Sequence, residues 1–173
     1  ERNGNIVELD YYVYREVFAW LRRRLDADGF AVPVSMNVSR FHLRDDKLIS
    51  YIKELMEEYR VPAKYLEFEL TENLYIENTD HVIPMIIELR GMGIKVSMDD
   101  FGSGYSSLNV LNDLPIDVIK LDKVFMKKSE LREGDKTIIS CVVEMAKKLH
   151  ITVLCEGVEN ADQDQFLRGI GCD

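Results

Sequence analysis

The chain has 173 residues, of which 46% are hydrophobic and 31% charged, a composition typical of a globular domain rather than a disordered segment. Its formal net charge of −9 argues against nonspecific binding to a nucleic-acid polymer, because such binding depends on cationic side chains that neutralise phosphates. The sequence contains neither an apolar run near the roughly 20 residues of a membrane span nor a signal-peptide pattern, so we expect a cytoplasmic domain.

Helical and strand patterns alternate along the whole chain. Apolar residues three or four positions apart predict a first helix over 6–25, closed by Asp28 and Gly29. The stretch AVPVSMNVS at 31–39 alternates in polarity and predicts a strand with Pro33 near its start. A loop with a short helix is expected between 100 and 117. The other predicted helices cover 44–60, 79–90, 135–149 and 161–168, and the other predicted strands cover 65–72, 94–100, 117–122 and 151–159.

Strands that alternate with helices predict a parallel sheet in an α/β fold. The alternative, an antiparallel sheet with one wet face, does not explain the helical connections. A doubly wound sheet would spread the polar residues that stand near the strand ends along one edge, whereas a barrel gathers strand ends around one mouth. We therefore predict a (β/α)8 TIM-like barrel. The strand-end residues, each about one βα unit from the next, are Asn37, Glu69, Asp99, Lys120 and Glu156.

The predicted barrel is incomplete in this chain. Five strands are predicted, and barrels of this class have at least about 200 residues. The sequence begins with Glu1 rather than Met and stops at Asp173. We expect a single partial domain over 1–173, cut from a longer multidomain protein.

The strand-end carboxylates favour divalent cations. Four carboxylates facing one ammonium group would raise one another's pKa steeply unless metal ions neutralised them. Carboxylate and amide oxygens form a hard ligand set that suits Mg²⁺ or Mn²⁺ better than zinc. The adjacent Asp99 and Asp100 could serve two ions, and two ions about 3.5 to 4 Å apart hydrolyse phosphodiesters by clamping the attacking and leaving oxygens. Lys120 would hold the water or stabilise the developing charge.

Other motifs are weaker. The DFG at 100–102 lacks the further motifs of a protein kinase. The GSG at 102–104 either cradles a phosphate or forms a tight turn. The three cysteines are widely spaced and indicate reduced thiols, and the three histidines lack ligand spacing and are expected at the surface or at helix ends.

Five stretches near the predicted strand ends form a specific set, namely MNVS (36–39), ELTEN (69–73), DDFGSGYSSL (99–108), LPIDVIKLD (114–122) and EGVE (156–159). Together they resemble the EAL domain family of bacterial phosphodiesterases, which linearise cyclic di-GMP to pGpG. The resemblance covers the chain from near residue 1 to residue 173.

The resemblance implies a set of metal ligands. One Mg²⁺ or Mn²⁺ ion would lie on Asn37, Glu69 and Asp99. A second ion would be shared by Asp99, Asp100 and Glu156. The Glu-Ala-Leu signature, whose glutamate is a further ligand in the family, and the last strand, with the family glutamine, are absent from this sequence.

The resemblance also assigns roles outside the metal ligands. Lys120 matches the lysine that contacts the catalytic water, and Glu156 and Glu159 match the two catalytic-motif glutamates. Glu72 matches the glutamate that anchors the loop after the aspartates. Arg40 is the candidate substrate contact, although RFHL at 40–43 departs from the commoner ARQF.

The family further implies partners. The segment 101–108 resembles the loop that couples dimerisation to activity, so a homodimer is expected. Diguanylate cyclase or sensory domains often accompany the family in one chain, and such segments could attach the domain to a membrane protein.

The sequence is compatible with three functions. The first is a cyclic di-GMP phosphodiesterase. The second is an inactive module that binds cyclic di-GMP as a sensor, and the third is a scaffold that acts through its dimerisation surface. The retained acidic site favours the enzyme, because a sensor or scaffold would be free to lose those residues.

Overall fold

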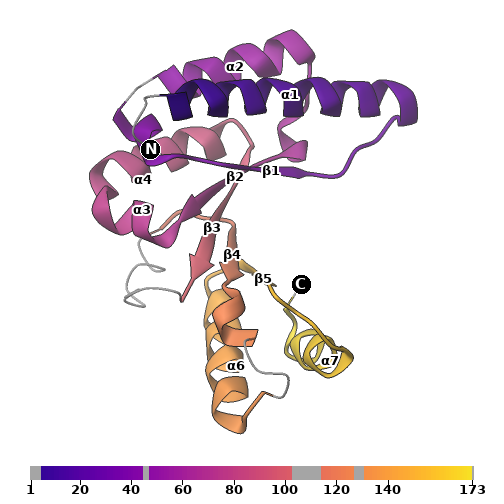
Figure 1. Cartoon of the computed structure of the whole chain (residues 1–173), viewed down its shortest axis with the longest axis vertical. Coiled ribbons are helices and arrows are strands. Elements are labelled where there is room, and N and C mark those ends of the chain that lie inside the picture. The colour runs from indigo at the N-terminus through magenta and orange to yellow at the C-terminus, as the bar shows by residue number, and fades with distance from the viewer. Residues whose placement is uncertain (1–4, 45–46, 103–113, 127–130, 173) are drawn as a thin grey trace. The chain divides into compact units, whose positions relative to one another are not determined.

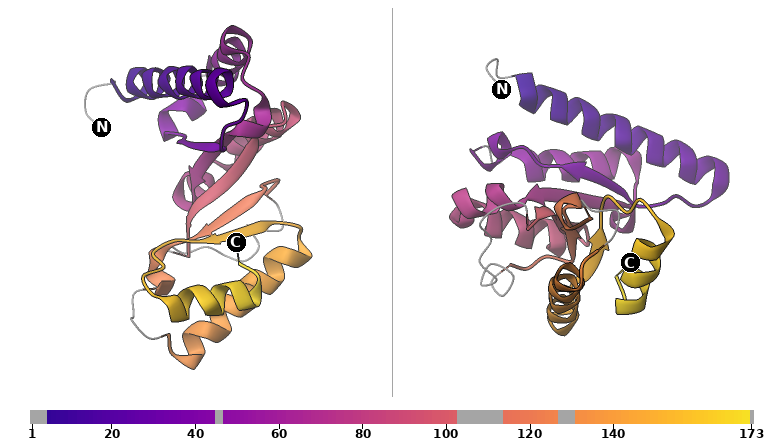
Figure 2. Two further views of the ribbon diagram at one scale, coloured as in Figure 1. Left: turned by 90° about the vertical axis from the view of Figure 1, so that its right-hand side faces the viewer. Right: turned by 60° about the horizontal axis from the view of Figure 1, so that its bottom comes forward.

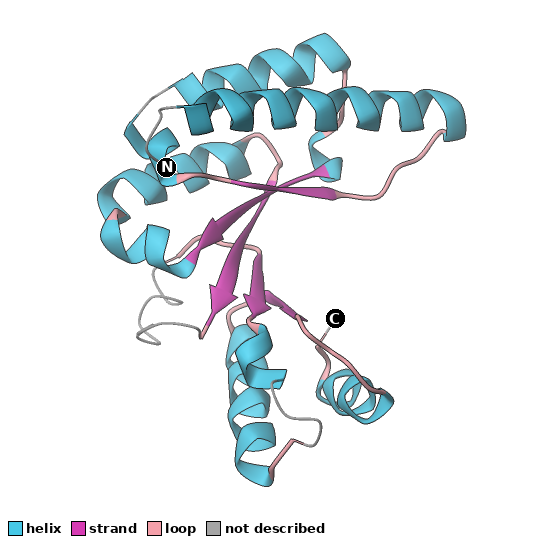
Figure 3. Ribbon diagram, viewed as in Figure 1, coloured by secondary structure: helices cyan, strands magenta, loops and turns pink. Residues whose placement is uncertain are grey.

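The computed structural model describes residues 5–44, 47–102, 114–126 and 131–172 (Figure 1). Helices and strands alternate as predicted, and the five strands lie in the order β1-β2-β3-β4-β5 (Figure 3). The strands are β1 (Val34–Asn37), β2 (Leu66–Thr71), β3 (Lys95–Phe101), β4 (Val118–Leu121) and β5 (Thr152–Cys155). The α-helices are α1 (Asn5–Asp28), α2 (Lys47–Tyr59), α3 (Glu72–Glu77), α4 (Thr79–Gly91), α6 (Glu133–Lys148) and α7 (Ala161–Ile170), and the 3-10 helices are η1 (Arg40–Arg44), η2 (Ala63–Tyr65) and η3 (Lys123–Met126).

The chain forms two compact units. The first unit comprises Glu1–Leu70 with Leu74–Val96, and the second comprises Thr71–Asn73 with Ser97–Asp173. Each unit contains parallel strands: β1 pairs with β2 in the first, and β3 pairs with β4 and β4 with β5 in the second. The prediction of a parallel α/β fold is therefore confirmed.

Apolar helix faces cover β1 and β2 in the first unit. α1 and α2 lie side by side, and each contributes side chains that are completely buried (Figures 1 and 2). Tyr14 of α1 packs edge-on against Phe68 of β2, with ring centroids 5.6 Å apart. Its hydroxyl donates a hydrogen bond to the backbone oxygen of Asn37 at 2.7 Å, which ties the end of β1 to α1. The completely buried apolar side chains of this unit include Phe18, Leu21, Ile52, Leu55, Leu66, Phe68, Val82, Ile86, Leu89 and Val96.

The second unit has its own core. α6 and α7 lie side by side and pack in the same unit as β4 and β5 (Figure 2). Asn160 caps α7 by accepting a hydrogen bond from the backbone N–H of Gln163 at 2.9 Å. The buried apolar side chains of this unit come from both the strands and the helices and include Ile119, Leu121, Ile139, Val143, Ala146, Val153 and Leu167.

The boundaries differ from the predictions at several points. β5 ends at Cys155 because Gly157 adopts a φ of +72°, which takes the chain out of extended geometry well before residue 159. η1 precedes α2, so the helix predicted over 44–60 begins at Lys47. α3 was not predicted. Most of the loop between 100 and 117 lies outside the described residues.

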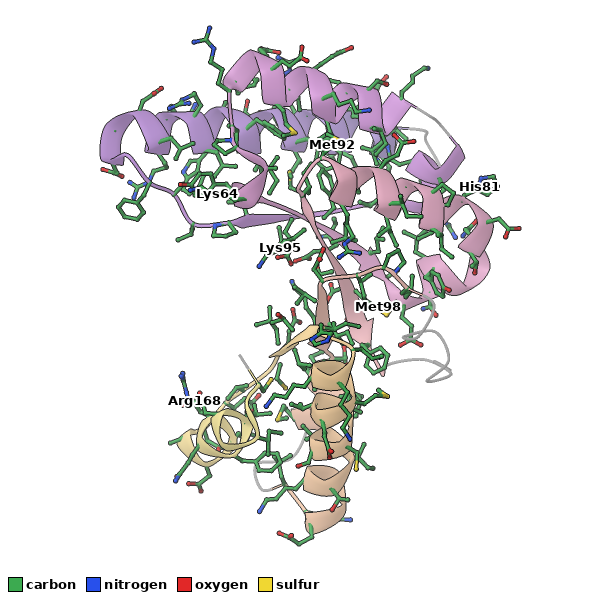
Figure 4. All side chains as sticks on the ribbon, turned by 180° about the vertical axis from the view of Figure 1, so that it is seen from behind. Lys64, His81, Met92, Lys95, Met98 and Arg168 are labelled. Carbon is green, nitrogen blue, oxygen red and sulfur yellow. The ribbon has the colours of Figure 1, made fainter. Side chains whose placement is uncertain are left out.

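One histidine prediction is wrong. His42 is 2% exposed, and its Nε2 lies 2.9 Å from Asp10 Oδ2. His81, by contrast, projects from α4 at the surface (Figure 4). Within the described ranges, no helix is long and apolar enough to cross a membrane.

Candidate active site

The end of β1 and the end of β2 present one pair of predicted ligands. Asn37 is in register with Glu69, and the backbone N–H of Val38 donates to Glu69 O at 2.9 Å. Because side chains in register on parallel neighbours point to the same face, these two lie on one face at the strand ends. Met36 and Phe68, one residue earlier, face the buried core instead. The first unit therefore brings together the two predicted ligands that it contains.

A β-bulge at the end of β3 positions the two aspartates in the second unit. Met98 is paired with Ile119, but the next pair joins Phe101 to Leu121, so Asp99 and Asp100 together oppose Lys120 alone. Asp100 has a φ of +56°, a left-handed conformation that aspartate tolerates better than most residues. Asp99 Oδ1 accepts the backbone N–H of Asp100 at 2.9 Å, which stabilises the bulge.

Strands β4 and β5 place further charges near the bulge. Lys120 Nζ lies 3.9 Å from Glu156 Oε1, and the lysine side chain is 15% exposed. Desolvation raises the pKa of the Asp100 carboxyl, and a hydrogen bond with Asp122 and the negative charges of Asp99, Asp122 and Glu156 raise it further. The structure thus gathers the predicted Asp99, Asp100, Lys120 and Glu156 into one cluster.

Asp122 is a member of this cluster that the sequence reasoning missed. It follows β4 directly, and its Oδ1 accepts the backbone N–H of Val124 at 2.6 Å. Its place two residues after Lys120, at the end of the quoted LPIDVIKLD, is the signal that could have identified it, because side chains two apart on a strand share a face.

Glu72 connects α3 to the turn after the aspartates. The side chain is almost completely buried, with the residue 1% exposed, and its Oε2 accepts the backbone N–H of Gly102 at 2.9 Å. Its Oε1 is buried with no hydrogen-bond partner among the described residues. The loop-anchoring role remains a prediction, since the segment from residue 103 to 113 lies outside the described residues.

The two remaining predicted site residues, Glu159 and Arg40, make other contacts. Glu159 is exposed, and its backbone N–H donates to Gln163 Oε1 at 2.8 Å. Arg40 belongs to the first unit, where its guanidinium lies over the Phe41 ring, 5.5 Å from the centroid. Of the predicted dimerisation segment 101–108, the described residues are Phe101 and Gly102.

The cluster fits a divalent cation by its donor chemistry. Asp99, Asp100, Asp122 and Glu156 offer carboxylate oxygens, and mutual repulsion is one cause of the raised pKa of Asp100. A bound cation would remove that repulsion. Within the described part of the chain, no group of three or more acid, histidine or cysteine side chains forms a ready metal site.

Comparison with known proteins assigns the chain to a family. The family model described as the EAL domain matches residues 1–173. The cyclic di-GMP phosphodiesterase NbdA of Pseudomonas aeruginosa is 36% identical over 173 residues, which are 100% of this chain and 22% of that protein. The chain spans between 19% and 38% of the length of the curated relatives it matches.

Solved structures show the same fold. The structure described as "PaMucR Phosphodiesterase, c-di-GMP complex" has a TM-score of 0.90 and 29% identity, and covers 100% of this chain and 70% of that one. A manganese and cyclic di-GMP complex of Klebsiella pneumoniae BlrP1 has a TM-score of 0.86, with 24% identity over 99% of this chain and 43% of that one. At 24% identity, the similarity to BlrP1 is evidence for the fold only. The expectation of an incomplete TIM-like barrel is confirmed, and the chain belongs to the EAL domain family.

Proposed function

We propose that this chain supplies the catalytic residues of a metal-dependent phosphodiesterase that hydrolyses cyclic di-GMP to linear pGpG. The observation that carries the proposal is the bulge at the end of β3, which sets Asp99 and Asp100 against Lys120. Because of the bulge, two adjacent carboxylates lie across from one ammonium group. Asp122 and Glu156 lie near enough to raise the pKa of Asp100. An acidic cluster of this kind at strand ends is suited to binding cations and, through them, a phosphodiester.

Two Mg²⁺ or Mn²⁺ ions are proposed per complete site. Asn37, Glu69 and Asp99 would hold the first, and Asp99, Asp100 and Glu156 the second. When bound, such ions activate a water and neutralise charge on the phosphate. Asp99 and Asp100 present their oxygens from a backbone fixed by the hydrogen bond between Asp99 Oδ1 and the Asp100 N–H.

Lys120 is proposed to orient the attacking water and to stabilise negative charge as it develops on the phosphate. Its ammonium group is largely shielded from solvent and lies 3.9 Å from Glu156 Oε1, a separation at which the pair attracts without a direct hydrogen bond. Glu156 and Glu159, on the loop after β5, are proposed as acidic catalytic residues. Glu72 is proposed to hold the turn at Gly102 in place.

The wider assembly is also a proposal. Arg40 would contact the substrate phosphate. A homodimer would form through the 101–108 region, in the cytoplasm, within a longer protein that carries diguanylate cyclase or sensory domains and can be attached to a membrane. That the chain covers 22% of NbdA supports the expectation of further domains.

The test uses the full-length protein with cyclic di-GMP and Mn²⁺ or Mg²⁺, with an EDTA control, and follows pGpG by chromatography. Asp99→Asn should abolish metal-dependent product, because it removes one charge from both proposed ion sites. The matched control is Asp164→Asn on α7, where the half-exposed aspartate side chain pairs with Arg168, which projects from the helix at the surface (Figure 4). This control should retain turnover.

The possible results of this experiment distinguish an enzyme from a sensor. Metal-dependent turnover that is lost in Asp99→Asn and kept in Asp164→Asn supports the proposal. Normal turnover in Asp99→Asn refutes the metal assignment. Tight binding of cyclic di-GMP by the wild-type protein without any pGpG would refute the enzyme proposal and indicate a sensor.

A further inference from the structure

Two glycines in the second unit lie against the same short helix. Gly102 follows β3 with a φ of +89°, and Gly157 follows β5 with a φ of +72°. A Cβ on Gly102 would lie 2.4 Å from Cε2 and Cζ of the Phe125 ring, and a Cβ on Gly157 would lie 2.6 Å from Lys123 Cβ. Contacts this short are not tolerated by real side chains. The turns after β3 and β5 therefore both pack on η3 as closely as glycine permits.

The Phe125 ring occupies the space next to the turn that ends the aspartate bulge. Gly102 is two residues beyond Asp100, and its backbone N–H donates a hydrogen bond to Glu72 Oε2 at 2.9 Å. The backbone N–H of Asp122 also donates to Phe101 O at 3.2 Å. Glu72, Asp122 and Phe125 thus fix three consecutive points of the turn.

η3 itself is fixed on both sides. Its start is held by Asp122, whose Oδ1 accepts the N–H of Val124 at 2.6 Å. Its end is held by Gln163, a residue 2% exposed, whose side-chain amide lies 3.4 Å from Met126 O. The same Gln163 side chain accepts the backbone N–H of Glu159 at 2.8 Å. A continuous set of contacts therefore joins the loop after β5 to η3 and, through Phe125, to the turn after β3.

We propose that Phe125 is a positioning residue for the acidic cluster: its ring, seated against Gly102, holds the Asp99–Asp100 bulge in register with the loop that carries Glu156. The inference rests on the proposed function in so far as it concerns turnover. The ring itself does not touch substrate or metal in this role. It acts by removing the space into which the turn would otherwise relax.

The first test is spectroscopic and independent of catalysis. The missing Cβ position of Gly102 points at the ring, so one Gly102 α-proton lies in the ring current of Phe125 and should resonate away from its ordinary position. Phe125→Leu should return that resonance toward the ordinary value. Val124→Ala, which changes an exposed neighbour on η3, should leave it unchanged. An unmoved Gly102 resonance in Phe125→Leu would overturn the proposed contact.

The second test is a size exchange between the two residues. Gly102→Ala should lower the unfolding temperature strongly, because the new methyl group meets the ring. In a Phe125→Ala background the same change should cost less, and the remaining loss reports the strain of a positive φ. Fully additive losses would show that the ring does not restrain the turn.

The third test measures turnover in the full-length protein. Phe125→Ala should lower kcat by about 10- to 100-fold with a much smaller change in KM, as expected when reacting groups are misplaced by about 1 Å. Phe125→Leu should recover part of kcat, and Val124→Ala should behave as wild type. If kcat in a folded Phe125→Ala variant is unchanged, the positioning role is wrong. A wild-type protein without turnover would contradict the proposed function, and the spectroscopic and size-exchange tests would still decide the contact.

Discussion

Removing the Glu72 carboxylate tests how the turn after the aspartates is held. Glu72 Oε2 accepts the Gly102 N–H at 2.9 Å, and the glutamate is 1% exposed. A hydrogen bond to a charged group contributes about 1.5 to 3 kcal/mol, and a donor left buried without a partner costs about 1 to 3 kcal/mol. We therefore expect Glu72→Ala to reduce the local stability of the turn by about 2 kcal/mol, a value in the middle of these ranges.

Amide hydrogen exchange measures this loss at the affected group. A change of about 2 kcal/mol corresponds to a roughly 30-fold faster exchange of the Gly102 amide, since about 1.4 kcal/mol is tenfold. Asn73→Ala is the matched control, because Asn73 is an exposed neighbour on α3 and its loss should leave Gly102 protected. Gly102 exchange that stays within about threefold of wild type in Glu72→Ala would refute the reasoning.

Three further predictions concern the rest of the chain. Phe68→Ala should lower the free energy of unfolding by about 3 to 5 kcal/mol in urea titration, because it empties a completely buried position in the first unit; a loss below about 1 kcal/mol would contradict this packing. Burial raises the pKa of the Cys155 thiol to about 12, so at pH 8 it carries almost no thiolate, and a thiol reagent should label the exposed Cys141 much faster; fast labelling that persists in Cys141→Ser would be inconsistent with this environment. Asn160→Ala should cost about 1 kcal/mol by removing the cap on the Gln163 N–H, and unchanged unfolding in urea would argue against the cap.

The alternation of the elements could be predicted because it depends on patterns that extend over many residues. Val34 and Met36 share one phase of β1, and Ser35 and Asn37 share the other, so strand type follows from the period of two. Parallel pairing then brings the strand ends to one edge, which is why Asn37 and Glu69 could be named as neighbours before their register was known.

The parts that could not be predicted depend on tertiary contacts. His42 gave no signal of burial, because its partner Asp10 lies on another element more than thirty residues earlier. α3 consists of six residues, too few to establish a helical period in the sequence. Asp122 is the last residue of the strand predicted over 117–122, and its influence on Asp100 depends on the pairing of β3 with β4, which the sequence does not show.

The bulge resolves a conflict that the sequence alone presents, namely two adjacent carboxylates at the end of a buried strand. In an undistorted β3, the register after Met98 and Ile119 would set Asp99 opposite Lys120 and Asp100 opposite Leu121. Leu121 is completely buried, so Asp100 would then be a charge facing the core. The extra residue and the positive φ of Asp100 give that position to Phe101, which is 3% exposed, and leave Asp100 exposed near Asp122 and Glu156. A single backbone irregularity therefore both preserves the core of the second unit and provides the second carboxylate of the proposed metal site.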